Sequence, residues 1–120
     1  MNVLFVIDTI SYADHIAIAY LSAIAKSKGH NTLLCILSDR NLEDAVEQVR
    51  PDIVAYSSNV VGFDNIVKQH KKVSTTHQFI SILGGPQATF CPHTFKDSGM
   101  DAYCVGEGEW SFRDVLEALQ

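Results

Sequence analysis

Small, hydroxyl-bearing and glycine residues gather in four short segments, each of which directly follows a run of apolar residues. Hydroxyl and amide side chains can form hydrogen bonds with a ligand, and glycines let a ligand approach the main chain closely. The candidate ligand-contacting residues are Asp8, Thr9, Ile10 and Tyr12, then Ser57, Ser58 and Asn59, then Gly84, Gly85, Pro86 and Thr89, and finally Gly106, Glu107 and Gly108. This composition is typical of a surface that binds a flat or elongated ligand.

Several other uses of such segments can be tested against these residues. A phosphate-receiving signalling domain needs an aspartate after the third apolar run and a lysine after the fourth, where this sequence has Ser57 and Gly84. The sequence matches a flavin-mononucleotide phosphate loop poorly, because no glycine accompanies Thr9 and Ser11. It also contains no P-loop motif. The segment Gly106-Glu107-Gly108 begins like a dinucleotide-binding fingerprint, but the third glycine is missing. The residues therefore favour none of these functions.

Two hydrophobic periodicities alternate along the chain and indicate the elements that must position these segments. Short apolar runs rich in β-branched residues predict five buried strands, at residues 3–7, 32–37, 53–56, 79–83 and 102–105. Apolar residues at helical spacing predict helices at about residues 15–28, 41–49, 62–74 and 110–119. Residues 84–99 show neither pattern and are expected to be irregular.

The first predicted helix has a signal at each end. Asp14 can cap its first turn, and Gly29 can end it because glycine adopts the left-handed conformation common after a helix. Its apolar positions at helical spacing are Ile16, Tyr20, Ala23 and Ile24.

The alternation of strands and helices predicts the fold. Strands that are apolar on both faces and separated by helices favour a parallel sheet covered on both sides. Right-handed crossovers then favour an α/β, flavodoxin-like (Rossmann-like) doubly wound sheet of five strands in the order 2-1-3-4-5. In such sheets a ligand binds beyond the carboxyl ends of the strands, at the switch point between strands one and three. The four candidate segments are expected to meet there.

Length, charge and cysteine content further limit the possible functions of the chain. The chain has 120 residues, 47% of them apolar and 19% charged, which is the content of one globular domain over residues 1–120. Its net charge is −5 and its basic residues are scattered, so we expect no nucleic-acid partner. No apolar run approaches the length of a membrane span. Cys35, Cys91 and Cys104 are widely spaced, which is typical of a reducing, cytoplasmic compartment.

The glycine-containing segments, taken in their order, resemble a known family. The residues that carry the resemblance are Gly84-Gly85-Pro86-x-Ala88-Thr89 and, further along, Asp101 to Val105 followed by Gly106-Glu107-Gly108-Glu109. Ile18 to Ala23, Gly29-His30 and Arg50-Pro51-Asp52-Ile53-Val54 extend it over nearly the whole chain. Together they resemble the N-terminal cobalamin (vitamin B12)-binding domain of radical S-adenosylmethionine (SAM) enzymes.

The resemblance implies a corrin ligand over the strand ends, with its nucleotide tail in the crevice at the switch point. Ser57 and Ser58 are then expected beside the tail, and Gly84 and Gly85 beside its ribose-phosphate part. Thr89 would add a hydroxyl, and residues 106–108 would turn under the corrin edge. For Asp8 two roles stay open: it orients the first segment, or it caps backbone amides at the end of the strand. The apolar residues Ile10 and Tyr12 would cover the lower face of the macrocycle.

The sequence departs from the better-known methylcobalamin domains after the first strand. Those domains carry Asp-x-His-x-x-Gly, whose histidine binds cobalt, whereas here Ala13 and Ile18 stand at the flanking positions of His15. We therefore expect base-off cobalamin with no histidine ligand, and no metal ligand from this chain.

Two parts of a complete radical SAM enzyme are missing from these 120 residues. The three cysteines lack the Cys-x-x-x-Cys-x-x-Cys spacing that binds an iron–sulfur cluster. S-adenosylmethionine and a [4Fe-4S] cluster are accordingly expected only in a longer parent protein, whose downstream radical SAM domain would be the partner. We expect no catalysis by this chain alone, and a role as methyl carrier. The alternative is an interaction domain that keeps the fold but has lost the cofactor.

Overall fold

The structure, a computed structural model, describes residues 1–10 and 12–120, with side chains for all of these except residues 12–15. Its elements in chain order are β1 (Asn2–Ile7), α1 (Tyr12–Ser27), β2 (Asn31–Ile36), α2 (Leu42–Val49), β3 (Ile53–Ser57), α3 (Phe63–Ser74), β4 (Ile80–Gly84), α4 (Pro86–Phe90), a 3₁₀ helix (Pro92–Asp97), β5 (Ala102–Tyr103) and α5 (Glu109–Leu119). Strands and helices alternate, as the two periodicities predict.

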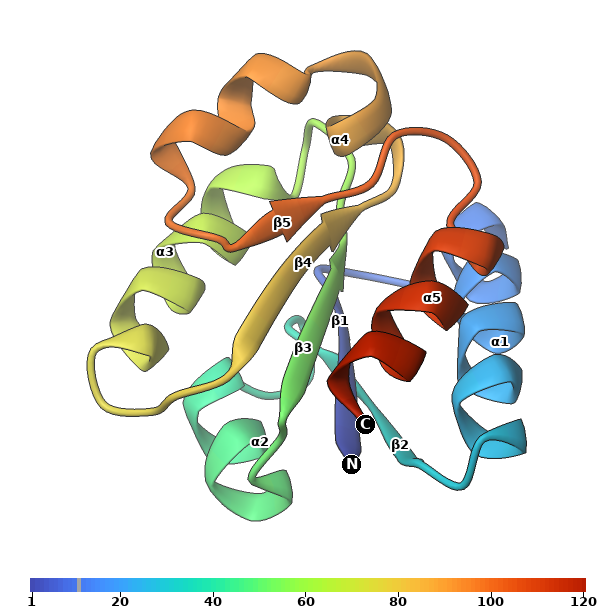
Figure 1. Cartoon of the computed structure of the whole chain (residues 1–120). Helices are drawn as coiled ribbons and strands as arrows, with labels where there is room; N and C mark the ends of the chain where they lie inside the picture. Colours follow the sequence, from blue (N-terminus) through green and yellow to red (C-terminus); the bar gives the residue numbers. More distant parts are fainter. Residues whose placement is uncertain (11) are drawn as a thin grey trace.

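The five strands form one parallel sheet in the order β2-β1-β3-β4-β5, which confirms the predicted fold (Figure 1). The chain goes from β1 to β2 on one side and then crosses back to β3 on the other side of β1, so the switch point lies between β1 and β3. The carboxyl ends of all the strands therefore lie at the same edge of the sheet, at the top of Figure 1.

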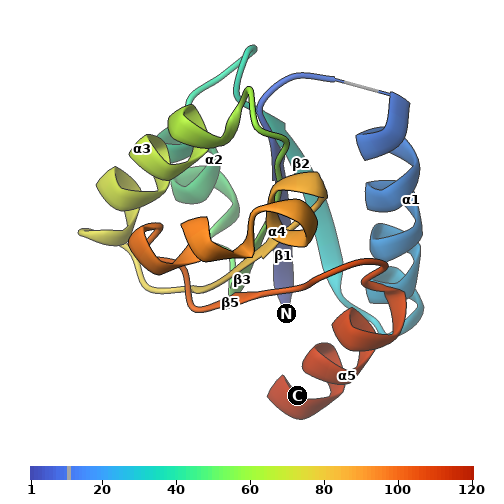
Figure 2. The same cartoon turned by 90° about the horizontal axis from the view of Figure 1, so that it is seen from above.

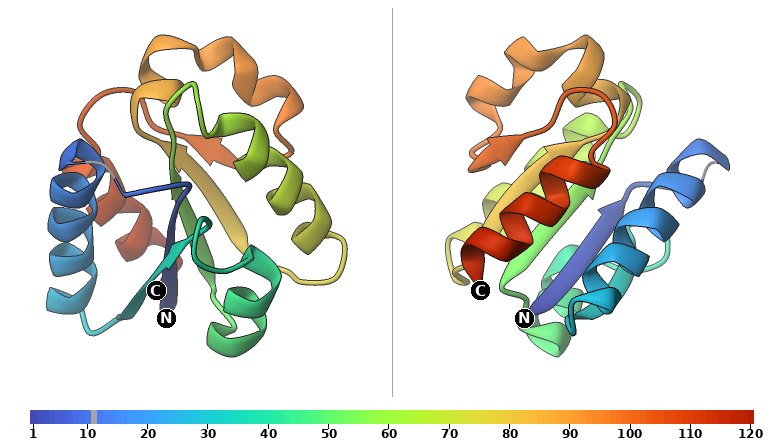
Figure 3. Two further views of the ribbon diagram at one scale, coloured as in Figure 1. Left: turned by 180° about the vertical axis from the view of Figure 1, so that it is seen from behind. Right: turned by 45° about the vertical axis from the view of Figure 1, so that its right-hand side comes forward.

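Helices cover both faces of the sheet, with α2 and α3 on one side and α1 and α5 on the other (Figures 2 and 3). Each layer encloses a core. Leu4, Val54 and Leu83 pack against α2 and α3, whereas alternate residues of the same strands, such as Phe5 and Ala55, pack against α1 and α5. This alternation follows from the two-residue period of a strand and explains why the central strands are apolar throughout.

Three sequence-based expectations about local structure were wrong. Residues 84–99 are not irregular, because α4 and the 3₁₀ helix lie within them. Asp14 is the third residue of α1 and does not precede it, since the helix begins at Tyr12. The last strand ends at Tyr103, two residues earlier than predicted, so residues 104–108 form a longer loop. Gly29, with φ +86°, does end α1 as predicted.

The buried side of α1 also differs from the expected one. Ile16 and Tyr20 are 62% and 60% exposed, while Ile18 and Ala25 are buried against the sheet. The cause is that α1 carries apolar residues on nearly all sides, so helical spacing alone does not identify its inner face. Within the described residues, no helix is long and apolar enough to cross a membrane.

Candidate functional site

An apolar cleft of about 650 Å³ opens at the carboxyl ends of the strands, between the sheet and the pair α1 and α5. The helix residues that line it come from positions 16–21 of α1 and 109–115 of α5, which are the amino-terminal halves of the two helices. At their other ends the helices are tied together by an ion pair between Lys28 and Glu117, with 2.6 Å between Nζ and Oε1. The cleft is thus open toward the strand ends and closed toward the opposite edge.

Small residues create this space. Ala55 on β3, Gly84 at the end of β4, Ala102 on β5 and Ala17 on α1 all line the cleft. Larger residues also line the cleft: Phe5 and Phe112 pack together with 5.7 Å between ring centroids and 53° between the ring planes. The sequence therefore leaves a gap near the strand ends that the rest of the layer does not have.

The loops that follow β1, β3, β4 and β5 form the upper boundary of the site, and we call them the shelf (residues 8–10, 57–62, 84–90 and 104–108). The loops after β1 and β3 are joined by Asp8, whose Oδ1 accepts a hydrogen bond from Asn65 Nδ2 at 2.8 Å. Gly62 allows this approach, because a Cβ at that position would lie 2.5 Å from Asp8 Cβ. Asp8 therefore holds the start of α3 against the end of β1.

The loops after β3 and β4 are joined through their main chains. Ser58 N–H donates to Gly84 O at 3.2 Å, and Gln87 N–H donates to Ser58 O at 2.8 Å. Gly85 has φ +84° and ψ −172°, a region open essentially to glycine alone. A Cβ there would lie 2.8 Å from Ser57 Oγ. The glycine pair thus lets α4 begin directly against the end of β3.

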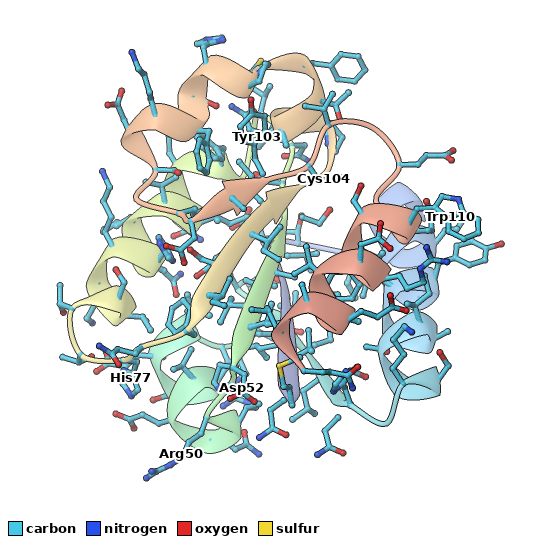
Figure 4. All side chains as sticks on the ribbon, in the orientation of Figure 1. Arg50, Asp52, His77, Tyr103, Cys104 and Trp110 are labelled. Carbon is cyan, nitrogen blue, oxygen red and sulfur yellow. The ribbon has the colours of Figure 1, made fainter. Side chains whose placement is uncertain are left out.

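The loop after β5 is fastened to α4 by a side chain. Thr89 Oγ1 accepts a hydrogen bond from Gly106 N–H at 2.9 Å, and Gly106 has φ +79°. Nearer the strand, Cys104 N–H donates to Leu83 O at 2.8 Å. Figure 4 shows Tyr103 and Cys104 at the upper end of the sheet and Trp110 at the start of α5. Residues 104–108 consequently form one wall of the cleft.

The structure brings only some of the predicted residues to the cleft. Those that line it are Ser57, Gly84, Gly85, Gly106, Glu107 and Gly108. Those on the shelf but outside the lining are Asp8, Thr9, Ile10, Ser58, Asn59, Pro86 and Thr89. Ser58 is 2% exposed and its Oγ donates to Asn59 O, so its side chain serves the loop. The side chains of Tyr12 and His15 lie outside the described residues.

Exposed apolar side chains lie on the shelf. Ile10, Val60, Val61 and Phe90 are between 57% and 90% exposed and come from the loops after β1 and β3 and from α4. When the apolar face of a flat ligand covers such side chains, their apolar surface is removed from water, and this favours binding. Val60, Val61 and Phe90 were not among the predicted site residues, although two adjacent valines in a strand-end loop are a signal that the sequence contains.

The cleft carries negative charge only. Glu107 and Glu109 line its mouth, and no lysine, arginine or histidine occurs among the described lining residues. Free multiply charged anions, such as nucleoside polyphosphates, would meet no cation here. The lining therefore suits a ligand that is largely uncharged.

The buried titratable groups belong to the other layer and to its packing. Tyr56 O–H donates to His70 Nδ1 at 2.8 Å, and His70 Nε2–H donates to Gly99 O at 3.2 Å. Burial lowers the pKa of His70, partly opposed by the Gly99 carbonyl and by Asp101. Burial likewise raises the pKa of Tyr56 and that of Cys35. These groups are neutral and structural, and none of them supplies an acid or base to the cleft.

A second hollow, of about 580 Å³, lies at the amino ends of β3 and β4, where Figure 4 shows Asp52 and His77. Its carboxylates already have partners: Asp52 Oδ2 accepts Asn2 N–H at 2.8 Å, and Asp101 Oδ2 accepts Ser81 N–H at 2.8 Å. No group of three or more metal-ligating side chains occurs among the described residues. We therefore take the cleft and the shelf as the functional site, in keeping with the rule for doubly wound sheets.

Sequence reasoning missed the walls of the cleft. Ile82, Leu21 and Val115 line it, but in the sequence they resemble any other core residue. No local pattern identifies them, because the cleft exists only where α1 and α5 pack beside the sheet.

Comparison with known proteins adds independent information on fold and family. A cobalamin-binding protein from Desulfitobacterium hafniense DCB-2 superposes with a TM-score of 0.71 at 14% identity, and the match covers 99% of this chain but 58% of that protein. The receiver domain of a DNA-binding response regulator from Colwellia psychrerythraea 34H gives a TM-score of 0.66 at 16% identity, covering 99% and 97% of the two chains. At these identities the likenesses concern the fold alone. A search among curated protein sequences finds no match.

The sequence itself decides the family. The pattern described as "B12 binding domain" matches residues 5–116 of the 120, which is nearly the whole chain. The matched region includes every strand-end loop of the shelf and all the residues that line the cleft. The chain belongs to the B12-binding domain family.

Proposed function

We propose that this chain binds cobalamin, with the corrin ring over the shelf and the nucleotide tail in the cleft. The observation that carries the proposal is the apolar cleft itself, which opens at the same edge of the sheet as the loops that carry the exposed apolar residues of the shelf. Cobalamin has a flat macrocycle, which the exposed apolar residues of the shelf can cover, and an aromatic tail, which the apolar cleft can enclose. The apolar volume of about 650 Å³ lies within the roughly 300–1,000 Å³ of small-molecule sites.

The residues of the cleft and of the shelf fit cobalamin. Gly84 and Gly85 bring main chain to the rim of the cleft, and Ser57 adds a hydroxyl there. Ile10 and Val61 offer apolar contact area, 57% and 90% exposed, for the face of the ring. No cation occurs among the described lining residues, which disfavours the more highly charged phosphates of flavin mononucleotide or a dinucleotide more than the single phosphodiester charge of a cobalamin tail.

Bound cobalamin supplies a cobalt-centred methyl group for transfer, and the chain's own residues hold and orient the cofactor. The bonds of Asp8 to Asn65 and of Thr89 to Gly106 keep the shelf in place before the ligand arrives. Such preorganisation lowers the cost of ordering loops on binding. We further propose that cobalamin would be held base-off and without a histidine ligand, with the residues that line the cleft holding its nucleotide tail.

We also propose that the chain works beside a radical SAM domain in a longer protein. This rests on the resemblance of residues 84–89 and 101–109 to the cobalamin-binding domains of those enzymes. The test is to read the gene beyond residue 120 for Cys-x-x-x-Cys-x-x-Cys. Its absence from the entire encoded protein contradicts the radical SAM part of the proposal and leaves cobalamin binding untouched.

The binding proposal is tested by mixing the purified chain with hydroxocobalamin and passing it through a desalting column. We expect coloured protein in stoichiometric amount, with the absorbance spectrum of base-off cobalamin. Colourless protein contradicts the proposal and favours an interaction domain without cofactor. A spectrum with a histidine nitrogen on cobalt contradicts the base-off, histidine-free part.

A further inference from the structure

The two edges of the sheet differ in how well they are protected from another strand. Proteins usually block pairing at an edge with a very short strand, a charge, a proline or a bulge. The edge strand β5 has only two residues, and its Tyr103 packs against Phe95 with 4.7 Å between ring centroids. The other edge strand, β2, has six residues in unbroken register with β1 and contains no charged residue and no proline. Figure 3 (left) shows β2 with α1 on one side and α2 on the other.

Every second residue of β2 directs its main chain away from the sheet. Asn31 N–H donates to Met1 O at 3.0 Å, so the odd-numbered residues of β2 bond to β1. The main chains of the even-numbered residues, Thr32, Leu34 and Ile36, therefore point outward. Among the described residues, Ile36 O accepts two N–H groups of the turn that follows, but no bond to the outward N–H or C=O of Leu34 occurs. This edge thus carries donors and acceptors that water or another strand must satisfy.

The side chains of β2 are apolar and exposed on both faces of the sheet. Leu33 and Leu34 are 52% and 41% exposed. Leu33 shares the α2 face with the buried Cys35, and Leu34 shares the α1 face with Ile36. A strand added at this edge would remove both leucines from water at once, which favours its addition.

The helix beside β2 leaves room for such a strand. Ser22 of α1 lies over β2, with 2.7 Å between its Oγ and Thr32 Oγ1. The neighbouring positions on that side of the helix, Ala19 and Ala23, are small and exposed. No long side chain of α1 at these positions stands between solvent and the edge.

We infer that β2 is a dimerisation edge, at which two copies of this chain pair antiparallel and join their five-stranded sheets into one. A twofold axis perpendicular to the sheet makes a strand its own antiparallel partner and continues each face into the same face of the other copy. Residues of equal parity are then opposite each other, so the axis passes at Leu33 or Leu34.

The charge of β2 favours a second copy over a different partner. Identical side chains face each other near a twofold axis, so any charge on the strand would meet its own like. A different protein could instead be recognised by charges opposite to those of β2, but this strand has none to offer. The inference is separate from cobalamin binding, since no residue of β2 lines the cleft.

Sedimentation velocity of the 120-residue chain over a range of concentrations tests the inference. We expect the wild-type chain to sediment with the mass of two chains. Leu34→Lys removes apolar contact and brings two like charges together, so the dissociation constant of the dimer should rise at least about tenfold. Leu119→Lys is the matched control, because Leu119 lies on α5 and is 39% exposed, and it should leave the constant unchanged.

Two outcomes of this experiment overturn the inference. One is a wild-type chain that stays monomeric up to about 100 μM. The other is a dimer whose dissociation constant changes equally in Leu34→Lys and Leu119→Lys, which would place the contact elsewhere.

Disulfide cross-linking tests the geometry independently of any loss of stability. Opposite residues of antiparallel strands have Cα atoms about 4.5–5.5 Å apart, within reach of a disulfide. In a chain with Cys91 and Cys104 replaced by serine, we expect Leu33→Cys or Leu34→Cys to give at least about threefold more covalent dimer under mild oxidation than Val61→Cys. Val61 is the control because it is 90% exposed and lies on the shelf, away from β2. Equal cross-linking at all three positions contradicts pairing through β2.

Discussion

Glycines at two shelf positions illustrate how single residues make the site possible. Both Gly85 and Gly106 have positive φ, at +84° and +79°, but only Gly85 is also crowded. A Cβ at Gly85 would lie 2.8–2.9 Å from atoms of Ser57 and Ser58, whereas a Cβ at Gly106 would have nothing within 4 Å. Gly85 is therefore required by close approach as well as by its backbone conformation.

Alanine substitution at these two glycines should separate the two effects. Gly106→Ala should lower the free energy of unfolding by about 1–2 kcal/mol through backbone strain alone. Gly85→Ala should lower it by a further ~1–3 kcal/mol, because the added methyl group overlaps the end of β3. Chemical denaturation of both variants measures the difference. Equal losses would show that the approach of α4 to β3 is not tight.

His70 gives the stability of the fold a pH dependence with a defined sign. Burial lowers its folded pKa below the ordinary value of 6.5, so the unfolded chain binds more protons at acidic pH. The stabilisation is complete above pH 6.5 and decreases as the pH falls from there toward the lowered pKa. The slope from one such group reaches at most about 1.4 kcal/mol per pH unit.

His70→Gln should therefore flatten the dependence of unfolding free energy on pH between about 7 and 5. His30 has a pKa shifted in the same direction, chiefly by burial, so some slope remains in the variant. Denaturant titrations at several pH values measure both slopes. An identical slope in the wild-type chain and the variant would mean that burial does not hold His70 neutral.

The short strand β5 is the element on which the cleft wall depends. Only Ala102 and Tyr103 pair with β4, so residues 104–108 rely on few bonds beyond the ladder. The Thr89 hydroxyl provides one of them, from α4 to Gly106 N–H. Because the residues that follow β5 line the cleft directly, the position of this wall is set by a side chain on another element.

Thr89→Val should remove this bond while keeping the shape of the side chain, and Thr89→Ser should keep the bond. We expect hydrogen exchange at the Gly106 amide to become about fivefold faster or more in Thr89→Val, which corresponds to about 1 kcal/mol. Exchange in Thr89→Ser should stay close to that of the wild-type chain. Equal protection in all three proteins would show that Thr89 does not hold the wall.

At the level of elements, the sequence predicted the strands and helices that depend on local hydrophobic pattern. It did not predict features that depend on how the elements pack together. Alternating runs located all five strands and four helices, and Gly29 located the end of α1. The inner face of α1 could not be found, because the exposed Ile16 is the same residue type as the buried Ile18. The helix α4 was missed because it has five residues, too few to show a helical period.

At the scale of the whole molecule, the strand order followed from general rules of parallel sheets, and the location of the site followed from that order. The strand-end loops, with Ser57, Gly84 and Gly106, could thus be placed together from sequence alone. The cleft beneath them could not, since Ala17 and Val115 lie nearly 100 positions apart and meet only in the folded chain. Small residues matter there for the space that they leave, which no sequence motif records.

Titration calorimetry with hydroxocobalamin on three proteins tests the central claim, that the cleft is where the cofactor's tail binds. Ala17→Phe fills the cleft from α1, while Ala23→Phe places the same ring on an exposed position of that helix outside the lining. Thermal melting of all three proteins confirms that each is folded. We predict that the wild-type chain and Ala23→Phe bind with similar affinity and that Ala17→Phe binds at least about tenfold more weakly. Equal affinity in all three, or no binding by the wild-type chain, would contradict this account.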